Sequence, residues 1–305
     1  MKPDLRVSIG GLELENPTML AAGVLGLSGS VLKRVAESGA GAVVTKSIGL
    51  VPREGYSGPT VVSVKCGLLN AIGLSNPGID EFVKEIPVAK EGGVPVIISI
   101  YGCSPEEFAT LARRCEEAGG DAVELNVSCP HVEKYGMQVG QDPALVSRIV
   151  KRVKSSTRIP VLVKLTPNIT DVTEVAKAAA DSGCDGITAI NTLRAMAVEI
   201  ETSRPLLGGV YGGLSGPAIK PVAVRCVYEI HKSVRVPVIG VGGIEDWRDA
   251  VEFILAGASA VQIGSTVSRG GLSIFRRVTR GLSGYLRRKG FRSVSDIVGL
   301  SHSGE

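Results

Sequence analysis

The residues best suited to chemistry in this chain are an asparagine, a serine and a cysteine at Asn126, Ser128 and Cys129. They follow residues 122–125, an apolar stretch that predicts a buried strand, and Pro130 then ends that strand. A thiol accepts a proton once its surroundings favour the thiolate, and an amide both donates and accepts hydrogen bonds. The pattern predicts a proton acceptor beside an amide where a strand becomes a loop. The alternative is a buried structural cysteine that caps a core strand.

Two lysines occupy similar positions in other predicted strands. Lys46 ends an apolar segment just before Ser47, and Lys164 lies among aliphatic residues in the segment 161–165. Lysine is rarely fully buried without a partner, so Lys164 either snorkels out of the protein or serves a ligand. Two cations at the ends of strands favour an anionic ligand.

Small residues follow the last two predicted strands. Gly242 and Gly243 come after one strand, and Gly264 and Ser265 come after the next. Backbone N–H groups can approach a phosphate closely only where no side chain intervenes, so these turns predict a phosphorylated cofactor. The first strand is not followed by GxGxxG, which argues against a nicotinamide dinucleotide as the resident cofactor.

The elements that must position these residues form a repeated pattern. Glycines mark helix ends, prolines open several strands, and short apolar strands alternate with helices, as in parallel βαβ units. Helix starts are indicated by a capping box at Ser104-Pro105 and by a cap at Asp142-Pro143. The eight predicted strands lie near residues 18–22, 42–48, 95–101, 122–128, 160–165, 186–191, 236–241 and 260–264.

Eight such units predict an α/β fold, a (β/α)8 TIM barrel, in which functional residues gather at the carboxyl ends of the strands. We expect residues 1–305 to form one barrel domain; an open doubly wound sheet is the alternative. Residues 50–80 and 193–216 carry many glycines and prolines and fit no unit, so we expect them to be insertions over that end of the barrel.

Composition excludes several classes of function. A net charge of +4 is too small to argue for nucleic-acid binding. The six cysteines are scattered without a CxxC pair, so we expect neither a metal site, nor an iron–sulfur cluster, nor a disulfide framework. Reduced thiols fit a cytoplasmic protein. We expect no signal peptide and no membrane span.

Together the motifs resemble the class 1 dihydroorotate dehydrogenases, which are FMN-containing (β/α)8 barrels, over nearly the whole chain. The stretch from Asn191 to Pro217 is most similar to the catalytic subunit of the NAD-linked class 1B type. The resemblance is carried by Asn16-Pro17, Thr45-Lys46-Ser47, Asn70-Ala71-Ile72-Gly73-Leu74, Asn126-Val127-Ser128-Cys129-Pro130, Lys164-Leu165-Thr166-Pro167, Ile190-Asn191-Thr192 and Gly213-Leu214-Ser215-Gly216-Pro217-Ala218.

This resemblance implies oxidation of (S)-dihydroorotate to orotate in the de novo biosynthesis of pyrimidines (UMP). It implies that Cys129 is the base that removes the C5 proton while a hydride leaves C6 for FMN N5. Lys46 would face both substrate and flavin. Lys164 would lie near the flavin N1/O2 edge and stabilise the anionic reduced ring.

The resemblance also implies two sets of binding residues. Substrate would be held by Lys46, Asn70, Ala71, Ile72, Gly73, Leu74, Asn126, Asn191 and Thr192. FMN would be held by Ala22, Lys46, Ser47, Ser99, Asn126, Lys164, Ile190, Gly216, Gly242, Gly243, Gly264 and Ser265. Two positions depart from the family pattern: Ser99 stands where class 1B members often have Asn, and Ala195 replaces a frequent Gly.

Class 1B enzymes pass electrons to a partner subunit that carries FAD and a 2Fe–2S cluster, and then to NAD. We therefore expect a homodimer of this chain within a heterotetramer; the alternative is a homodimer that uses fumarate or another soluble acceptor. We also expect residues 130–141 to form a lid that excludes water during proton transfer.

Two other functions remain open at this stage. One is a dihydropyrimidine dehydrogenase-like reduction of uracil or thymine, although that relative carries Glu where this chain has Ile72. The other is a non-catalytic barrel that binds a phosphorylated ligand, which would leave Cys129, Lys46 and Lys164 unexplained as a set.

Overall fold

The computed structural model describes residues 2–128 and 139–303. Within them, eight parallel strands close into a barrel, so the alternative of an open sheet is wrong. Seven of them lie within the segments predicted from sequence, and β16 (Ala258–Ile263) overlaps its segment but begins two residues earlier. In their order around the barrel they are β3 (Thr18–Leu20), β4 (Ala42–Val44), β7 (Val96–Ile100), β8 (Ala122–Asn126), β9 (Val161–Leu165), β10 (Gly186–Ala189), β15 (Val238–Val241) and β16 (Ala258–Ile263).

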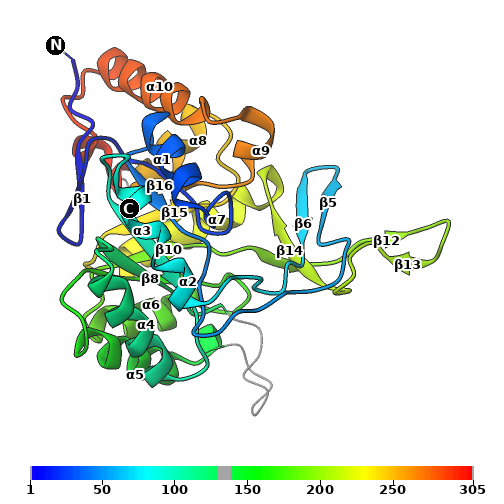
Figure 1. Ribbon diagram of the computed structural model, residues 1–305. Helices are drawn as coiled ribbons and strands as arrows, with labels where there is room; N and C mark the ends of the chain where they lie inside the picture. Colours follow the sequence, from blue (N-terminus) through cyan, green and yellow to red (C-terminus); the bar gives the residue numbers. More distant parts are fainter. Residues whose placement is uncertain (1, 129–138, 304–305) are drawn as a thin grey trace.

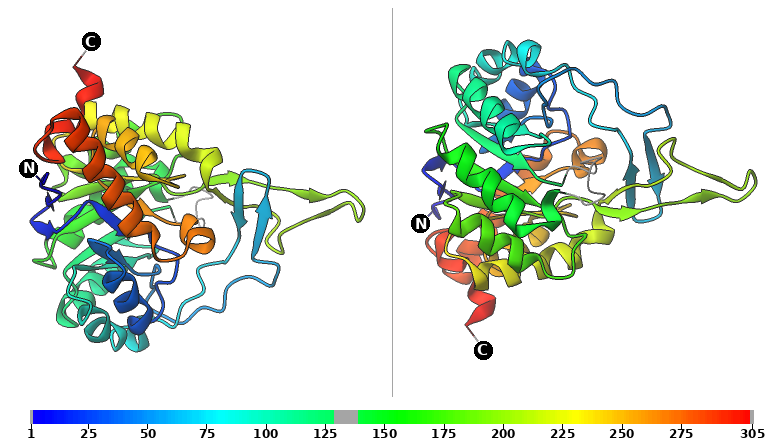
Figure 2. Two further views of the ribbon diagram at one scale, coloured as in Figure 1. Left: turned by 90° about the horizontal axis from the view of Figure 1, so that it is seen from above. Right: turned by 90° about the horizontal axis from the view of Figure 1, so that it is seen from below.

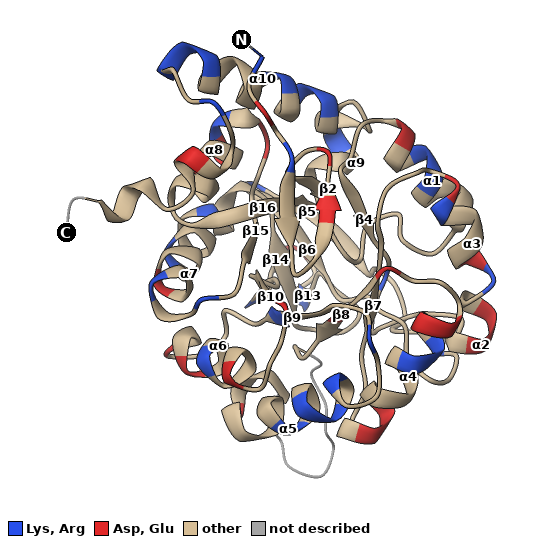
Figure 3. Ribbon diagram, turned by 90° about the vertical axis from the view of Figure 1, so that its left-hand side faces the viewer, with Lys and Arg blue, Asp and Glu red and all other residues tan. Residues whose placement is uncertain are grey.

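Helices surround the barrel, and the view along its axis shows their charged residues on the outer side (Figure 3). The helix α5 (Pro143–Lys154), for example, buries an apolar stripe of Val146, Ile149, Val150 and Val153. The α-helices are α1 (Gly29–Glu37), α2 (Ile79–Phe82), α3 (Glu85–Lys90), α4 (Pro105–Glu117), α5 (Pro143–Lys154), α6 (Val172–Asp181), α7 (Lys220–Ser233), α8 (Trp247–Leu255), α9 (Thr266–Gly270) and α10 (Ile274–Lys289). Short 3₁₀ turns are η1 (Val139–Gln141), η2 (Pro217–Ile219), η3 (Ser295–Ile297) and η4 (Leu300–His302).

Both predicted helix starts are confirmed. Ser104 Oγ accepts the N–H of Glu107 at 3.2 Å, and Asp142 Oδ1 accepts two N–H groups of the turn that follows it. The Glu107 carboxylate accepts the N–H of Cys103 at 2.6 Å, one residue before the position that a reciprocal capping box would use.

The amino-terminal end of the barrel is closed by an antiparallel hairpin, β1 (Val7–Ile9) and β2 (Leu12–Leu14). Its buried Ile9 and Leu14 pack against the apolar interior residues of the strands, among them Met19 and Leu162. Figure 1 shows this hairpin at the end of the barrel opposite the insertions. Water is therefore kept out of the barrel from this side.

The two predicted insertions lie over the carboxyl ends of the strands, as expected. They pair with each other in one antiparallel sheet whose order is β11–β14–β6–β5, and they add a hairpin, β12–β13, that projects away from the barrel (Figures 1 and 2). These strands are β5 (Val61–Val64), β6 (Gly67–Asn70), β11 (Leu193–Ala195), β12 (Val198–Glu199), β13 (Arg204–Pro205) and β14 (Gly212–Ser215).

A search of the described ranges for a membrane-crossing helix finds none that is both long and apolar enough.

The hairpin that closes the barrel yields a stability prediction. Ile9→Ala removes a side chain with no exposed surface from the apolar layer, so we expect the free energy of unfolding to fall by about 2–5 kcal/mol. The matched control is Ile200→Ala, because Ile200 is 81% exposed beyond β12 and its loss should change stability by less than about 0.5 kcal/mol. Equal denaturation midpoints for the two variants would show that the hairpin does not seal the core.

Candidate active site

Side chains on or shortly after four strands form a hydrogen-bonded arc at the carboxyl end of the barrel. Asn126, the last residue of β8, donates from Nδ2 to Ser47 Oγ at 3.0 Å and accepts at Oδ1 from Asn191 Nδ2 at 3.2 Å. Ser47 Oγ in turn lies 2.9 Å from the hydroxyl of Ser99 on β7. Because parallel strands end at one rim, residues far apart in sequence meet here. The structure brings these four predicted site residues together.

Asn70 reaches the same region from the insertion sheet. It lies opposite Gly213 in the β6–β14 ladder, and its Nδ2 donates to the Gly213 carbonyl at 3.0 Å. A Cβ added to Gly213 would contact the Thr192 side chain and approach Asn70 Nδ2 to 3.4 Å, so both side chains lie close to this glycine. The insertion sheet therefore carries Asn70 to the chain segment that continues from Asn191.

A buried asparagine that sequence reasoning missed holds the segment after Asn70 in place. Asn76 Oδ1 accepts the N–H groups of Gly49 and Gly78, and its Nδ2 donates to the Leu74 carbonyl and to Tyr101 Oη. The predicted substrate residues Ala71, Ile72, Gly73 and Leu74 thus lie between two anchored asparagines. Four partners for one buried amide are a structural signal, and the sequence shows only an Asn in a loop.

A second missed asparagine, Asn168, ties the strand ends together. Its Nδ2 donates to Thr166 Oγ1 and to the Thr192 carbonyl, and its Oδ1 accepts the N–H of Arg194. Its own carbonyl accepts from Gln141 Nε2 at 2.6 Å. The loop after β9 thereby fixes the chain that leaves β10 and the start of α5.

Lys46 is half-buried directly after β4, and its backbone N–H donates to the Gly26 carbonyl. Burial lowers the pKa of its ammonium below the ordinary value of 10.5. Within residues 2–128 and 139–303 it has no carboxylate partner. An uncompensated, partly desolvated cation at the rim favours an anionic ligand.

Lys164 does not snorkel to the surface, because only 5% of the residue is exposed. Its Nζ lies 3.6 Å from Glu124 Oε1 and donates to Gln262 Oε1 at 3.2 Å. Glu124 was missed because it lies within an otherwise apolar strand, where the alternation of side chains directs it into the barrel. The signal was the charge itself, one acid inside a four-residue hydrophobic run.

The glycine turns after β15 and β16 have the form that a phosphate needs. Gly243 has a φ of +78°, and a Cβ there would lie 2.8 Å from the carbonyl oxygen of Gly216. Among the described residues, no acceptor is found for the N–H groups of Gly243, Gly264 and Ser265. Unpaired N–H groups on a surface without side chains suit a phosphate, so the residues present fit this part of a phosphorylated cofactor.

The other predicted cofactor residues lie along the same rim. The N–H of Ile190 donates to the Val241 carbonyl at 3.0 Å, next to Gly242, and Ala22 follows Ala21, whose N–H donates to the Ile263 carbonyl. Cys129 lies outside the described residues, as do residues 130–138 of the predicted lid. Ser128, directly before Cys129, donates its N–H to Asn126 Oδ1 at 3.2 Å, so the described chain leaves β8 beside the amide arc.

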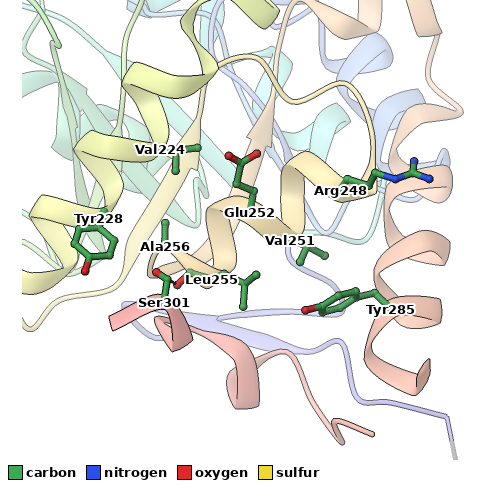
Figure 4. A pocket seen from close by; sticks show the side chains of 9 residues that line it. All are labelled: Val224, Tyr228, Arg248, Val251, Glu252, Leu255, Ala256, Tyr285 and Ser301. Carbon is green, nitrogen blue, oxygen red and sulfur yellow. Dashed lines mark hydrogen bonds between the residues drawn. The ribbon is translucent and has the colours of Figure 1, made fainter. Parts of the chain in front are cut away.

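A separate groove of about 470 Å³ lies on the outer flank of the barrel, between α7, α8, α10 and η4 (Figure 4). Its walls are mostly apolar, and Arg248 points its guanidinium away from the groove (Figure 4). Glu252 is already paired with Lys220 at 2.8 Å. None of the predicted site residues lines this groove, so the chemistry of the chain belongs to the rim.

A closed parallel barrel with amides, hydroxyls and two lysines at the carboxyl ends of its strands has the architecture of a (β/α)8-barrel enzyme. Comparison with known proteins gives the family. The family model described as dihydroorotate dehydrogenase matches residues 4–286. The chain therefore belongs to the dihydroorotate dehydrogenase family and is an oxidoreductase of that family.

Curated relatives agree over almost the full length. The chain is 53% identical over 293 residues to the "Dihydroorotate dehydrogenase B (NAD(+)), catalytic subunit" of Methanocella arvoryzae, covering 96% of each chain. It is 51% identical over 298 residues to the protein of the same name in Pyrococcus furiosus, covering 97% of this chain and 98% of the relative. The predicted resemblance to the class 1B type is confirmed.

The lowered pKa of Lys46 predicts a pH dependence of stability. Between that lowered value and 10.5, the unfolded chain holds a proton that the folded chain has released, so stability gains with rising pH. In the flavin-free protein, we expect the melting temperature of the wild type to rise relative to that of Lys46→Met between pH 7 and pH 10. The difference between the two proteins cancels the titration of all other groups. If the difference in melting temperature stays constant from pH 7 to pH 10, the pKa of Lys46 is not lowered.

Proposed function

We propose that this chain is the catalytic subunit of an NAD-linked dihydroorotate dehydrogenase, which oxidises (S)-dihydroorotate to orotate in pyrimidine biosynthesis. The observation that carries the proposal is the arc of Ser47, Asn126 and Asn191 at the rim of the barrel, next to Lys46. It is supported by the names of relatives that match almost the full length of the chain.

The arc matches the polarity of the substrate. The dihydroorotate ring offers N–H donors and carbonyl acceptors along its edge, and amide side chains can answer both. Asn70, Asn126 and Asn191 with Thr192 hold the ring in this proposal, helped by the chain from Ala71 to Leu74. Lys46 faces the negative charge of the substrate, which compensates its partly desolvated ammonium.

FMN is the proposed cofactor, and when bound it supplies the acceptor for the hydride from C6. The turns at Gly242, Gly243, Gly264 and Ser265 hold its phosphate, and Lys164 places positive charge beside its ring. Ser47, Ser99 and Asn126 contact the same ring from the strand ends. Ala22, Ile190 and Gly216 line the remaining wall of this site.

Cys129 is the proposed base. It follows Ser128 directly, and the Ser128 N–H donates to Asn126 Oδ1, so the described chain ends beside the proposed substrate amides one residue before Cys129. As thiolate it takes the proton from C5 of the substrate, and exclusion of water favours this transfer because the base then meets no competing solvent.

The name shared by the relatives includes the words "catalytic subunit" and NAD(+), which supports a partner that completes electron transfer. In this proposal two copies of the chain assemble with an electron-transfer subunit that carries FAD and a 2Fe–2S cluster, in the cytoplasm. Residues 1–305 then act as one FMN-binding domain.

The decisive experiment is anaerobic mixing of the FMN-loaded protein with dihydroorotate while flavin absorbance is followed. We expect rapid bleaching, followed by reoxidation by NAD only when the partner subunit is present. Bleaching by another dihydropyrimidine, with none by dihydroorotate, would reassign the substrate. Reoxidation by fumarate without a partner would reassign the acceptor.

Cys129→Ala tests the base. We expect the variant to retain flavin while bleaching slows by about 100-fold or more, because general base catalysis contributes about that much. Cys66→Ala is the matched control, since Cys66 is exposed on the turn between β5 and β6 and its loss should leave the rate unchanged. Equal rates in both variants would show that Cys129 is not the base.

Gly243→Ala tests the phosphate site. A Cβ there meets the Gly216 carbonyl at a residue with positive φ, so we expect FMN to bind about tenfold more weakly or worse. Gly257→Ala is the matched control. Gly257 also has a positive φ, but it lies directly before β16 at the other end of the barrel, and its added Cβ would contact His231. It should lower stability and leave FMN affinity unchanged. Loss of FMN affinity in both variants would count against a phosphate site at Gly243.

A further inference from the structure

A chain of buried polar groups crosses the barrel interior below the rim. Glu124 Oε2 accepts from Thr188 Oγ1 at 2.9 Å and from Gln262 Nε2 at 2.7 Å, and Gln262 Oε1 accepts from Lys164 Nζ at 3.2 Å. The second carboxylate oxygen, Oε1, has no hydrogen bond and lies 3.6 Å from Lys164 Nζ. Glu124, Gln262 and Thr188 have no exposed surface.

The hydrogen bonds that link Lys164, Gln262 and Glu124 can run in only one direction. A lysine ammonium can only donate, and an ionised carboxylate can only accept. Gln262 therefore turns its oxygen to Lys164 and its nitrogen to Glu124, and it links the two charges while the carboxylate also faces the ammonium directly. The Lys164 side chain is therefore held by two interactions: the direct attraction of the Glu124 carboxylate and the hydrogen bond to Gln262.

Stability does not account for this arrangement. A buried ion pair is often matched or exceeded in stability by apolar residues of similar volume, so its presence in a core calls for another role. The groups around Lys164 on the neighbouring strands are Asn126 and Glu124 on β8, Thr188 on β10 and Gln262 on β16, and Lys46 is the second cation of the mouth. Within the described residues, Glu124 is the one carboxylate that faces Lys164.

We propose that Glu124 is a positioning residue, which keeps Lys164 charged and directed at the flavin and acts through both direct attraction and Gln262. The inference rests on the proposed function, because it needs Lys164 beside the flavin ring. The Lys164 ammonium is then already directed at the ring as negative charge builds up there.

Glu124→Gln removes the charge with almost no change of shape. The new amide cannot satisfy its surroundings, because its NH₂ must face either Lys164 or the donors Thr188 and Gln262. A buried ammonium without a counter-charge favours its neutral form. Reduction of the flavin must then bring a proton to Lys164 as well, and the reduced flavin is less stable relative to the oxidised one.

The experiment compares the FMN-loaded wild type and E124Q in a redox titration against reference dyes, from pH 6 to pH 9. We expect the preference for reduced flavin in E124Q to fall at least tenfold at high pH, which is about 30 mV for two electrons. We also expect one more proton to be taken up per two electrons there, with the difference vanishing at low pH as Lys164 regains its proton.

Two controls separate this role from a structural one. E116Q makes the same change in a partly buried carboxylate that accepts from Thr157 and from the Arg158 N–H, at the opposite end of the barrel. Thr188→Val removes one hydrogen bond of Glu124 and keeps both charges. We expect the wild-type potential and proton count in both.

A second variant keeps the test decisive if E124Q does not fold or bind flavin. Gln262→Leu interrupts the link while both charges remain, and we expect a smaller fall in potential with the same pH trend. Wild-type potentials and proton counts in E124Q, or in Gln262→Leu where E124Q fails, would overturn the inference. If dihydroorotate does not bleach the flavin of the wild-type protein, the proposed function itself is refuted.

Discussion

The closure of eight parallel strands is the constraint on which the rest of the structure depends. Neighbouring strands align residues in register, so Asn126, Lys164 and Thr188 lie side by side although 62 positions separate the first from the last. Register partners in a parallel sheet point to the same face, and here that face is the barrel interior. A site assembled in this way needs no local sequence motif, because each strand supplies one or two side chains and closure brings them together.

The interior changes character along the barrel axis. At the amino end, the β1–β2 hairpin and the first residues of the strands form an apolar layer around Ile9 and Leu14. One layer higher, Glu124, Lys164 and Gln262 introduce charge and hydrogen bonds, and the amide arc lies above them at the rim. The apolar layer excludes water from below, which strengthens every electrostatic interaction above it because little solvent remains to screen the charges.

Much of this fold could be predicted from sequence because the residues that end its helices and begin its strands act locally. Glycines at helix ends, such as Gly119 and Gly257, have the positive φ that the pattern requires, and Pro95 stands directly before a strand. The rim residues were predictable for the same reason, since each follows a recognisable strand. The pairing of β6 with β14 was not predictable, because it joins residues about 140 positions apart and depends on the space over the barrel.

The residues that were missed share one property, which is that their importance lies in their partners. Asn76 and Asn168 are ordinary loop asparagines in the sequence, and each gains its role only when distant backbone groups converge on it. Glu124 is a single acid within an otherwise apolar strand of the sequence, and only the folded barrel shows the lysine that it faces. A sequence therefore indicates the residues that contact a ligand more readily than the residues that hold those ligand-binding residues in place.

The division between barrel and insertions separates two tasks under the proposed function. Residues at the strand ends, such as Lys164 and Gly243, belong to the barrel and face the proposed cofactor, whereas Asn70 belongs to the insertion sheet and faces the proposed substrate. Asn70 depends on Gly213, since any Cβ at that position would contact Thr192 and approach Asn70 Nδ2 to 3.4 Å. The residues that face the proposed substrate can therefore vary with the insertions while the buried polar groups beneath the rim stay fixed. All four of those groups lie in barrel strands, namely Glu124, Lys164, Thr188 and Gln262.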